Sequence, residues 1–188
     1  MMLNTMSEIL ISVDVETSGP IPGEYTMLSL GACVVGATEQ NFYVELKPIT
    51  RNFEPEAMAV AGFDLDDLDQ RGVEPKQAML DFERWISRMT PPNHSPVFVA
   101  YPIAFDWMFV AYYFHRFLDR NPFGIAGLDV KSFYAGMTGR AYTESSKRDM
   151  EPQFTSDLEL THNAVEDAIA QAKLFERLLA AQVRRSKQ

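Results

Sequence analysis

The sequence predicts an α/β fold, with a sheet of short apolar strands flanked by amphipathic helices. Two features predict it. Residues 9–13 and 97–100 are apolar runs of strand length, which is typical of buried strands. Between them, apolar residues recur at the spacing of one helix face, at Ala78, Phe82, Trp85, Ile86 and Met89. No internal repeat or linker interrupts the chain, so we expect residues 1–188 to form a single domain.

The first half of the chain is expected to supply three strands and two helices. The strands lie at residues 8–16, 26–36 and 41–47, and the helices at 55–61 and 75–89. The first helix has a proline near its start, where the missing N–H costs nothing. Residues 90–96 form a proline-rich connector.

The second half alternates strand and helix. It has a strand at residues 97–100, a helix at 105–118, an extended piece at 128–130, a helix at 131–136 and a last helix at 163–184. Gly136 is expected to end its helix, because glycine is common just after helices. Residues 139–157 are polar and are expected to form a long surface loop. The ordered core then spans about residues 8–183, before a basic tail at 184–188.

The composition favours a cytoplasmic enzyme without a membrane anchor. No apolar stretch reaches the length of a transmembrane helix, and the N-terminus does not resemble a secretory signal. The single cysteine, Cys33, lies in an expected strand and has no partner for an intrachain disulfide.

The net charge of −9 argues against binding along a nucleic acid duplex, which usually needs a basic surface. Bound divalent ions would offset part of this charge. The remainder still argues against a long duplex footprint. The basic residues available for phosphates are Lys147 and Arg148 in the loop, and Arg184, Arg185 and Lys187 in the tail. A homodimer is compatible with a tail that reaches phosphates in a neighbouring subunit.

Asp14 and Glu16 end the first apolar run. Because side chains alternate along a strand, both carboxylates point to the same face. Two buried carboxylates repel each other unless a cation lies between them, and a hard divalent metal is the obvious candidate. Alone, the D-x-E pattern at a strand end is also typical of a turn with a helix cap.

Asp106 follows the second apolar run, near the start of an aromatic-rich helix. An acid at this position interacts favourably with the helix dipole, which is one interpretation. The other is a third metal ligand at the carboxyl end of a strand, where open α/β sheets place their sites. This segment alone favours neither.

His162 and Asp167 flank the start of the last helix. Asn163 and Glu166 have the form of a capping box, which places His162 just outside the helix and Asp167 in its first turns. Both side chains can then turn toward one site. A lone histidine beside a helix start is more often an ordinary loop residue, but this one accompanies a fourth acid.

Together these segments resemble the three exonuclease motifs of the DEDDh family, the DnaQ-like 3′→5′ exonucleases of the ribonuclease-H-like superfamily. The motifs, in family order, are Asp14-x-Glu16, Asp106 in an Ala-Phe-Asp context, and His162 followed five residues later by Asp167. Residues 14–19 resemble the first motif closely. Residues 27–32 resemble the family's second strand, where many members carry Glu in place of Ser29. The resemblance implies a ribonuclease-H-like mixed five-stranded sheet flanked by helices.

The resemblance also implies a metal-dependent 3′→5′ exonuclease that releases 5′-mononucleotides from single-stranded nucleic acid, with RNA or short oligonucleotides somewhat favoured. Two Mg²⁺ or Mn²⁺ ions are expected on four carboxylates, those of Asp14, Glu16, Asp106 and Asp167. His162 is expected to take the proton from the attacking water, because its ordinary pKa suits a base near neutrality.

Contacts to the substrate are expected from two places. The backbone of Thr17, Ser18 and Gly19 is implied to line the pocket for the terminal nucleotide, and Phe105 or Trp107 is a candidate for an aromatic contact. Members often carry Asn near position 102, where this chain has Pro102, so the loop there departs from the family pattern. Two alternatives stay open: an oligoribonuclease-type enzyme restricted to very short RNA, and a non-catalytic nucleic-acid-binding scaffold on the same fold.

Overall fold

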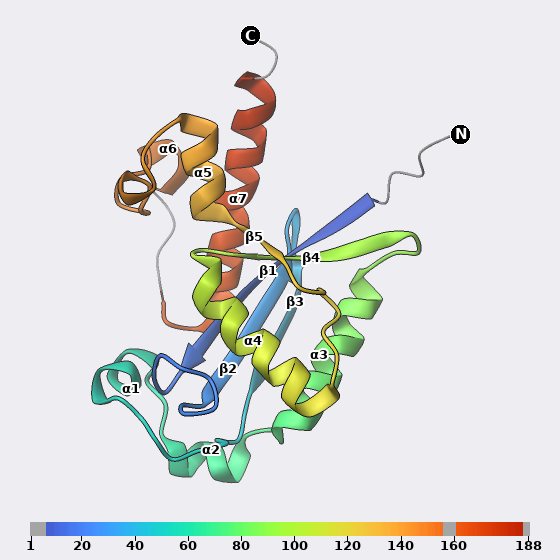
Figure 1. Ribbon diagram of the computed structural model, residues 1–188, viewed down its shortest axis with the longest axis vertical. Helices are drawn as coiled ribbons and strands as arrows, with labels where there is room; N and C mark the ends of the chain where they lie inside the picture. The colour runs from blue at the N-terminus through green and yellow to red at the C-terminus, as the bar shows by residue number, and fades with distance from the viewer. Residues whose placement is uncertain (1–6, 156–160, 186–188) are drawn as a thin grey trace.

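The computed structural model describes residues 7–155 and 161–185. They contain a five-stranded mixed sheet of order β3-β2-β1-β4-β5, with helices on both faces (Figure 1). The strands are β1 (Ser7–Thr17), β2 (Met27–Val34), β3 (Ala37–Glu45), β4 (His94–Ala100) and β5 (Gly127–Asp129). β1, β2 and β3 pair antiparallel, whereas β4 runs parallel to both β1 and β5. The predicted α/β class and mixed sheet are confirmed.

Seven α-helices and one 3₁₀ helix lie in the described ranges. They are α1 (Pro55–Ala61), α2 (Leu65–Arg71), α3 (Pro75–Met89), α4 (Ile103–Leu118), α5 (Val130–Thr138), η1 (Tyr142–Glu144), α6 (Pro152–Thr155) and α7 (Ala164–Arg185). Helix α7 continues through Arg185, so the first two residues of the expected basic tail are helical. No helix in 7–155 or 161–185 is long and apolar enough to cross a membrane.

Helix α2 was not predicted, although its signals are present in the sequence. The Asp64 carboxylate accepts hydrogen bonds from the backbone N–H groups of Asp66 and Asp67, which caps the helix start. Leu65 and Leu68 are buried on its inner face. With seven residues it offers too few periods for its apolar face to stand out against the surrounding acids.

The prediction that Gly136 ends a helix was wrong. Helix α5 continues through Gly136 to Thr138, and Gly139 ends it in the left-handed conformation with φ 73°. Glycine inside a helix costs only about 1 kcal/mol relative to alanine, so tertiary packing overrides it. Two strands also begin earlier than predicted. β3 begins at Ala37 instead of residue 41, and β4 begins at His94 instead of residue 97.

The expected surface loop at 139–157 is more structured than its polarity suggests. Among its described residues it contains η1 and α6, and the side chains of Met150 and Phe154 are buried. These two side chains join a core cluster with Tyr134 of α5 and Phe175 of α7. Residues 156 and 157 lie outside the described part of the chain.

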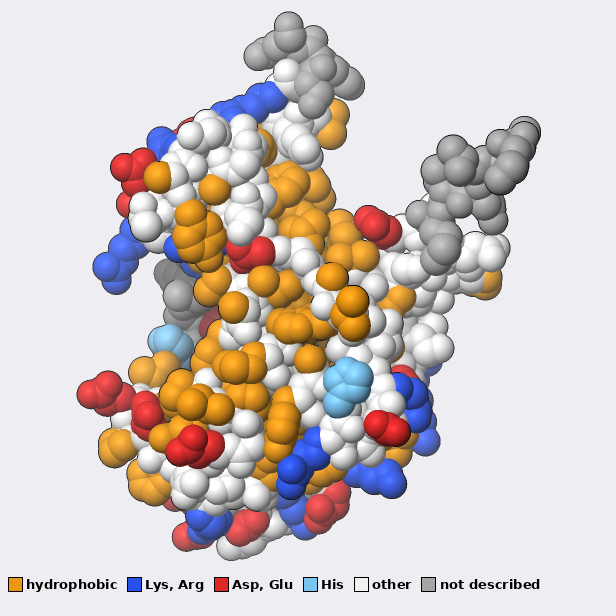
Figure 2. All heavy atoms as spheres, viewed as in Figure 1, with side chains coloured by type: hydrophobic (Ala, Val, Ile, Leu, Met, Phe, Trp, Pro, Cys, Tyr) orange, Lys and Arg blue, Asp and Glu red, His pale blue; other side chains and the backbone are white. Residues whose placement is uncertain are grey.

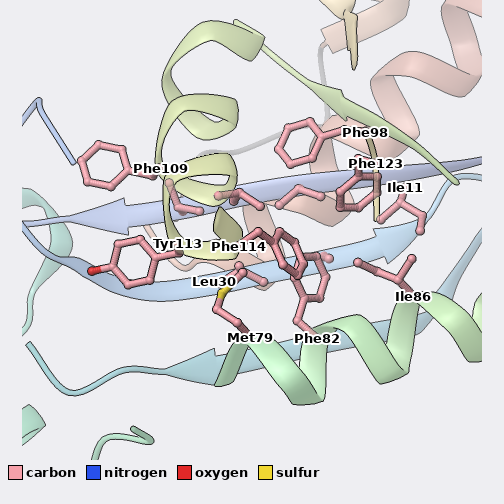
Figure 3. Packing of buried hydrophobic residues seen from close by; sticks show 14 of the residues in the cluster. Ile11, Leu30, Met79, Phe82, Ile86, Phe98, Phe109, Tyr113, Phe114 and Phe123 are labelled. Carbon is pink, nitrogen blue, oxygen red and sulfur yellow. The ribbon is translucent and has the colours of Figure 1, made fainter. Parts of the chain in front are cut away.

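The main core lies between the sheet and helices α3 and α4 (Figure 3). It is rich in aromatic side chains, and Phe82 of α3 stacks on Phe114 of α4 with ring centroids 5.7 Å apart. Helix α7 covers the opposite face, where the Ser12 hydroxyl of β1 donates to the Ala168 carbonyl at 2.8 Å. The two faces of β1 therefore belong to different layers, and the even-numbered residues face α7.

Candidate active site

The two acids of β1 lie where this strand leaves its parallel neighbour. β1 and β4 remain paired as far as Ser12 and Val99, and β1 then runs on beside β2 alone. Asp14 and Glu16 fall in this extension and share the α7 face with Ser12, as the strand alternation predicted. Parallel strands bring their carboxyl ends to the same edge, so the segment after β4 arrives beside both acids.

Asp106 comes from that segment, in the first turn of α4. Its side chain is buried with 5% exposed, and its Oδ1 accepts a hydrogen bond from the Val15 N–H at 3.1 Å. This N–H belongs to the part of β1 that β4 no longer covers. The Asp106 carboxylate therefore replaces a missing strand partner and is held beside the β1 acids.

Asp167 and His162 come from the start of α7. The Asp167 carboxylate is 5% exposed and accepts hydrogen bonds from the backbone N–H groups of Thr161 at 2.9 Å and His162 at 3.0 Å. Asn163 Oδ1 accepts from the N–H groups of Val165 and Glu166 at 3.2 and 3.3 Å. The predicted helix cap at Asn163 is therefore present.

His162 adopts a backbone conformation that residues other than glycine rarely take. Its φ is 56°, in the left-handed region, and its side chain is exposed. This conformation costs a non-glycine residue free energy. Two backbone bonds to Asp167, from His162 and its neighbour Thr161, hold the turn in place. The strained turn places the exposed imidazole beside the carboxylates of Glu16 and Asp167.

Glu16, His162 and Asp167 can present ligand atoms that all lie within 4.8 Å of one another. Carboxylate oxygens are the ligands that a hard divalent cation prefers, and the imidazole nitrogen lies close enough to act on a molecule bound beside them. Asp14 and Asp106 lie outside this group of three but close to it, since the charges of Asp106, Glu16 and Asp167 all act on Asp14. The residues present therefore fit a divalent metal site.

Burial and mutual repulsion raise the pKa values of these acids. Burial, and then the negative charges of Asp106, Glu16 and Asp167, raise the pKa of Asp14 well above its ordinary value. Burial and Asp167 raise the pKa of Glu16 to about 7, although His162 opposes the shift. Burial also raises the pKa of Asp106 to about 7, against the bond from Val15. Such a cluster gains stability from a bound cation.

Gly31 permits the close approach that brings Asp167 to the β1 acids. Gly31 of β2 lies opposite Asp14, and α7 crosses the sheet at this point. A Cβ atom here would overlap the backbone of Ala164 and Val165 at the start of α7. Backbone on both sides leaves nothing flexible to move, so any larger residue would push the start of α7 away.

Gln171 of α7 is a positioning residue that the sequence reasoning missed. Its side-chain nitrogen donates to the carbonyls of Val13 and Val99, both at 3.2 Å, and to the Ser12 hydroxyl at 2.9 Å. It thereby bridges β1 and β4 at the place where they separate. The available signal was one polar residue in the apolar stripe of the last helix, where it is 2% exposed.

The expected substrate contacts fall into two groups. The side chains of Thr17 and Ser18 are used within their own loop, since Thr17 donates to the Gly19 carbonyl and Ser18 to the Asn52 carbonyl. The Ser18 backbone is used as well, since its N–H donates to the Thr26 carbonyl and its carbonyl accepts from the Glu54 N–H. A contact between this loop and a terminal nucleotide stays a prediction.

The aromatic candidates differ from each other. Phe105 is 36% exposed, beside Asp106. Trp107 is partly buried and packs edge-on against the buried Phe98 of the core. Of the two, Phe105 is the side chain available to a substrate.

Comparisons with known sequences agree with this geometry. A family described as the 3′-5′ exoribonuclease Rv2179c-like domain matches residues 10–179. The 3′-5′ DNA exonuclease Cap18 of Escherichia coli is 45% identical over 177 residues, which cover 92% of each chain.

Solved structures show the same fold. The nuclease domain of 3′hExo, a DEDDh family member bound to rAMP, superposes with a TM-score of 0.74 at 11% identity and covers 94% of both chains. Exonuclease I of E. coli in complex with a dA16 oligonucleotide gives a TM-score of 0.68 at 15% identity, over 95% of this chain and 43% of that one. These likenesses confirm the predicted ribonuclease-H-like fold.

Proposed function

This chain belongs to the Rv2179c-like 3′-5′ exoribonuclease family, and from that premise we propose that it shortens single-stranded nucleic acid from the 3′ end with a divalent metal. It is a 3′-5′ exonuclease, as its family and its 45% identical relative are. The observation that carries the proposal is the convergence of acids from β1, α4 and α7, with His162, at the carboxyl end of the central strand β1.

Asp14, Glu16, Asp106 and Asp167 would hold the metal, and we propose two Mg²⁺ or Mn²⁺ ions. When bound, such ions lower the pKa of a coordinated water and stabilise charge on phosphate oxygens. The backbone bonds to Asp106 and Asp167 hold these two carboxylates in place before any ion arrives. Asp14 and Glu16 lie on a strand and are fixed by its register.

His162 supplies the base in this proposal. A ring nitrogen accepts a proton from the attacking water, and the water oxygen forms a new bond to the terminal phosphorus. The bond from phosphorus to the 3′ oxygen breaks, and this oxygen leaves with the shortened strand. The product is a 5′-mononucleotide. The imidazole suits the role because it is exposed and lies close to both Glu16 and Asp167.

The comparisons differ on the sugar. The family description names an exoribonuclease, whereas the 45% identical relative is named as a DNA exonuclease. The proposal therefore covers single strands of either kind. Matched 5′-labelled RNA and DNA, from dinucleotides to twenty-mers, would show which sugar and which length the enzyme prefers. An oligoribonuclease-type enzyme would act on RNA dimers and leave the twenty-mers intact.

The direction of cleavage is tested with one sequence in a linear and in a circular form. A linear 5′-labelled oligomer should give a ladder of products that shorten from the 3′ end, and EDTA should abolish it. A circular single strand of the same sequence has no 3′ end and should survive. Rapid cutting of the circle would overturn the exonuclease proposal, and activity that persists in EDTA would overturn the metal.

A further inference from the structure

The segment from Ser145 to Asp149 forms a fixed rim beside the candidate site. The Tyr101 hydroxyl donates to the Ser145 carbonyl at 2.7 Å, and the Ser145 hydroxyl donates to the Ala141 carbonyl at 2.9 Å. The Asp149 carboxylate accepts from the Ser146 N–H at 3.1 Å and also from the Ser146 hydroxyl. These bonds hold Lys147 and Arg148, between Ser146 and Asp149, in a defined place.

Lys147 reaches from this rim toward the acids. Its ammonium interacts with the charges of Asp14, Asp106 and Asp167, and burial lowers its pKa against their pull. Lys147 Nζ also lies 5.2 Å from the centre of the Tyr101 ring. Within the described part of the chain it forms no ion pair. The ammonium is therefore near the carboxylates and still available to another anion.

A cavity of about 430 Å³ opens at the same rim. Its lining residues are Tyr101, Pro102, Ser146, Lys147 and Arg148. The lining combines two cations with an aromatic ring and contains no acid, although the chain as a whole is strongly acidic. Cations that meet phosphates and an aromatic wall that meets a base are what a single-stranded nucleotide requires.

The position of the cavity indicates which nucleotide it would receive. The scissile phosphate must lie at the acids, because the reaction takes place there. Figure 1 places the α5–α6 segment on one side of the start of α4 and the loop after β1 on the other. In Figure 2 basic side chains project from the α5–α6 region at the upper left. If the terminal nucleotide lies toward Thr17 and Gly19, the upstream strand leaves past Lys147.

We propose that Tyr101 and the segment 145–149 form the subsite for the penultimate nucleotide. Lys147 contacts the scissile phosphate, Arg148 contacts the next phosphate upstream, and the Tyr101 ring is the wall against which the penultimate base packs. The assignment rests on the proposed function, since it takes the acids as the reaction centre. It gives this acidic protein a local basic surface for a short strand.

The test compares Lys147→Met with Lys131→Met. Lys131 is a matched control because it lies on α5 with its Nζ 4.0 Å from the Tyr142 ring centre, outside the acids' cluster. On a 5′-labelled oligomer, Lys147→Met should lower kcat/KM by about 10- to 100-fold, as expected for loss of a charged hydrogen bond. Lys131→Met should stay near wild type, and Lys147→Arg should recover most of the loss.

A second substrate separates the two phosphates. The 4-nitrophenyl ester of thymidine 5′-monophosphate keeps the scissile phosphate and lacks the penultimate nucleotide. Lys147→Met should slow its hydrolysis, whereas Arg148→Ala should slow only the oligomer. Binding of a 5′-dye-labelled oligomer in Ca²⁺ should weaken in Arg148→Ala, with a salt slope smaller by about 0.7.

The outcomes distinguish this subsite from the proposed function. Should wild type trim the oligomer while Lys147→Met and Lys131→Met remain equal, the subsite is wrong and the exonuclease stands. Equal loss on both substrates in Arg148→Ala would overturn the assignment of Arg148 to the upstream phosphate. A wild-type protein that trims no oligomer at all would overturn both.

Discussion

At the residue scale, His162 carries the most specific chemical expectation. Its imidazole is held over the acids by a left-handed backbone that the Asp167 bonds stabilise. His162→Ala should keep metal binding and lose about 10²–10⁴-fold in kcat, the usual effect of removing a general base. Single-turnover cleavage at neutral pH measures it. His162→Ala that cleaves at the wild-type rate would remove the imidazole from the mechanism.

Gln171 is predicted to matter for stability as well as for the site. Gln171→Leu leaves the buried Val13 and Val99 carbonyls without their donor, which should cost about 1–3 kcal/mol in the free energy of unfolding. Urea denaturation of the metal-free protein measures this loss. Gln77→Leu is the control, because Gln77 is exposed on α3 and should change stability by less than about 0.5 kcal/mol. Equal losses in both variants would contradict the bridging role.

At the element scale, the crossing of α7 over β2 decides whether the site can assemble. Gly31→Ala adds a methyl group against the backbone of Ala164 and Val165. Overpacking of this kind typically costs about 1–3 kcal/mol. Since it also moves Asp167, activity should fall further than stability alone explains. Thermal melting and single-turnover cleavage measure the two effects.

Gly136→Ala is the matched control for that prediction. Gly136 lies inside α5, and nothing stands within 4 Å of an added Cβ atom. The variant should gain up to about 1 kcal/mol, since alanine is the better helix former. Loss of stability in Gly136→Ala would contradict the assignment of this residue to the helix interior.

Sequence reasoning succeeded where the signal is local. Strand alternation placed Asp14 and Glu16 on one face, and the Asn163 cap placed His162 outside the last helix. What it missed depends on contacts between distant segments. The roles of Gln171 and Gly31 exist only because α7 crosses the sheet, and nothing near them in the sequence reveals that crossing.

The structure of the polar segment 139–157 also depends on contacts with distant segments. Composition indicated a surface loop, but Met150, which precedes α6, and Phe154, within α6, bury against α5 and α7. Two apolar residues are too few to predict a helix. They suffice to anchor one once a neighbouring surface is available.

At the scale of the whole molecule, the acid cluster should make stability depend on pH. In the metal-free protein the raised pKa values of Asp14, Glu16 and Asp106 let the folded state keep protons that the unfolded chain has released. Stability therefore falls as pH rises from about 4, the ordinary carboxyl pKa, toward 7. Melting in EDTA between pH 5 and 7 should show the decline, and Asp14→Asn should flatten it. A melting temperature that rises across this range would contradict the shifts.

We propose that Asp14, Glu16, Asp106 and Asp167 hold the metal as one site. The most direct test is the rise in melting temperature that saturating Mn²⁺ produces over an EDTA-treated sample at pH 7. A metal that binds only the folded state at a hundred times its Kd adds about 2.7 kcal/mol, or roughly 5–10 °C for a domain of this size.

Asp14→Asn/Glu16→Gln is the variant to compare, because neither carboxylate accepts a hydrogen bond from residues 7–155 or 161–185. The melting temperature should rise by about 5–10 °C in wild type and by little in the variant. A rise of equal size in both proteins would place the metal elsewhere and contradict a site formed by these carboxylates.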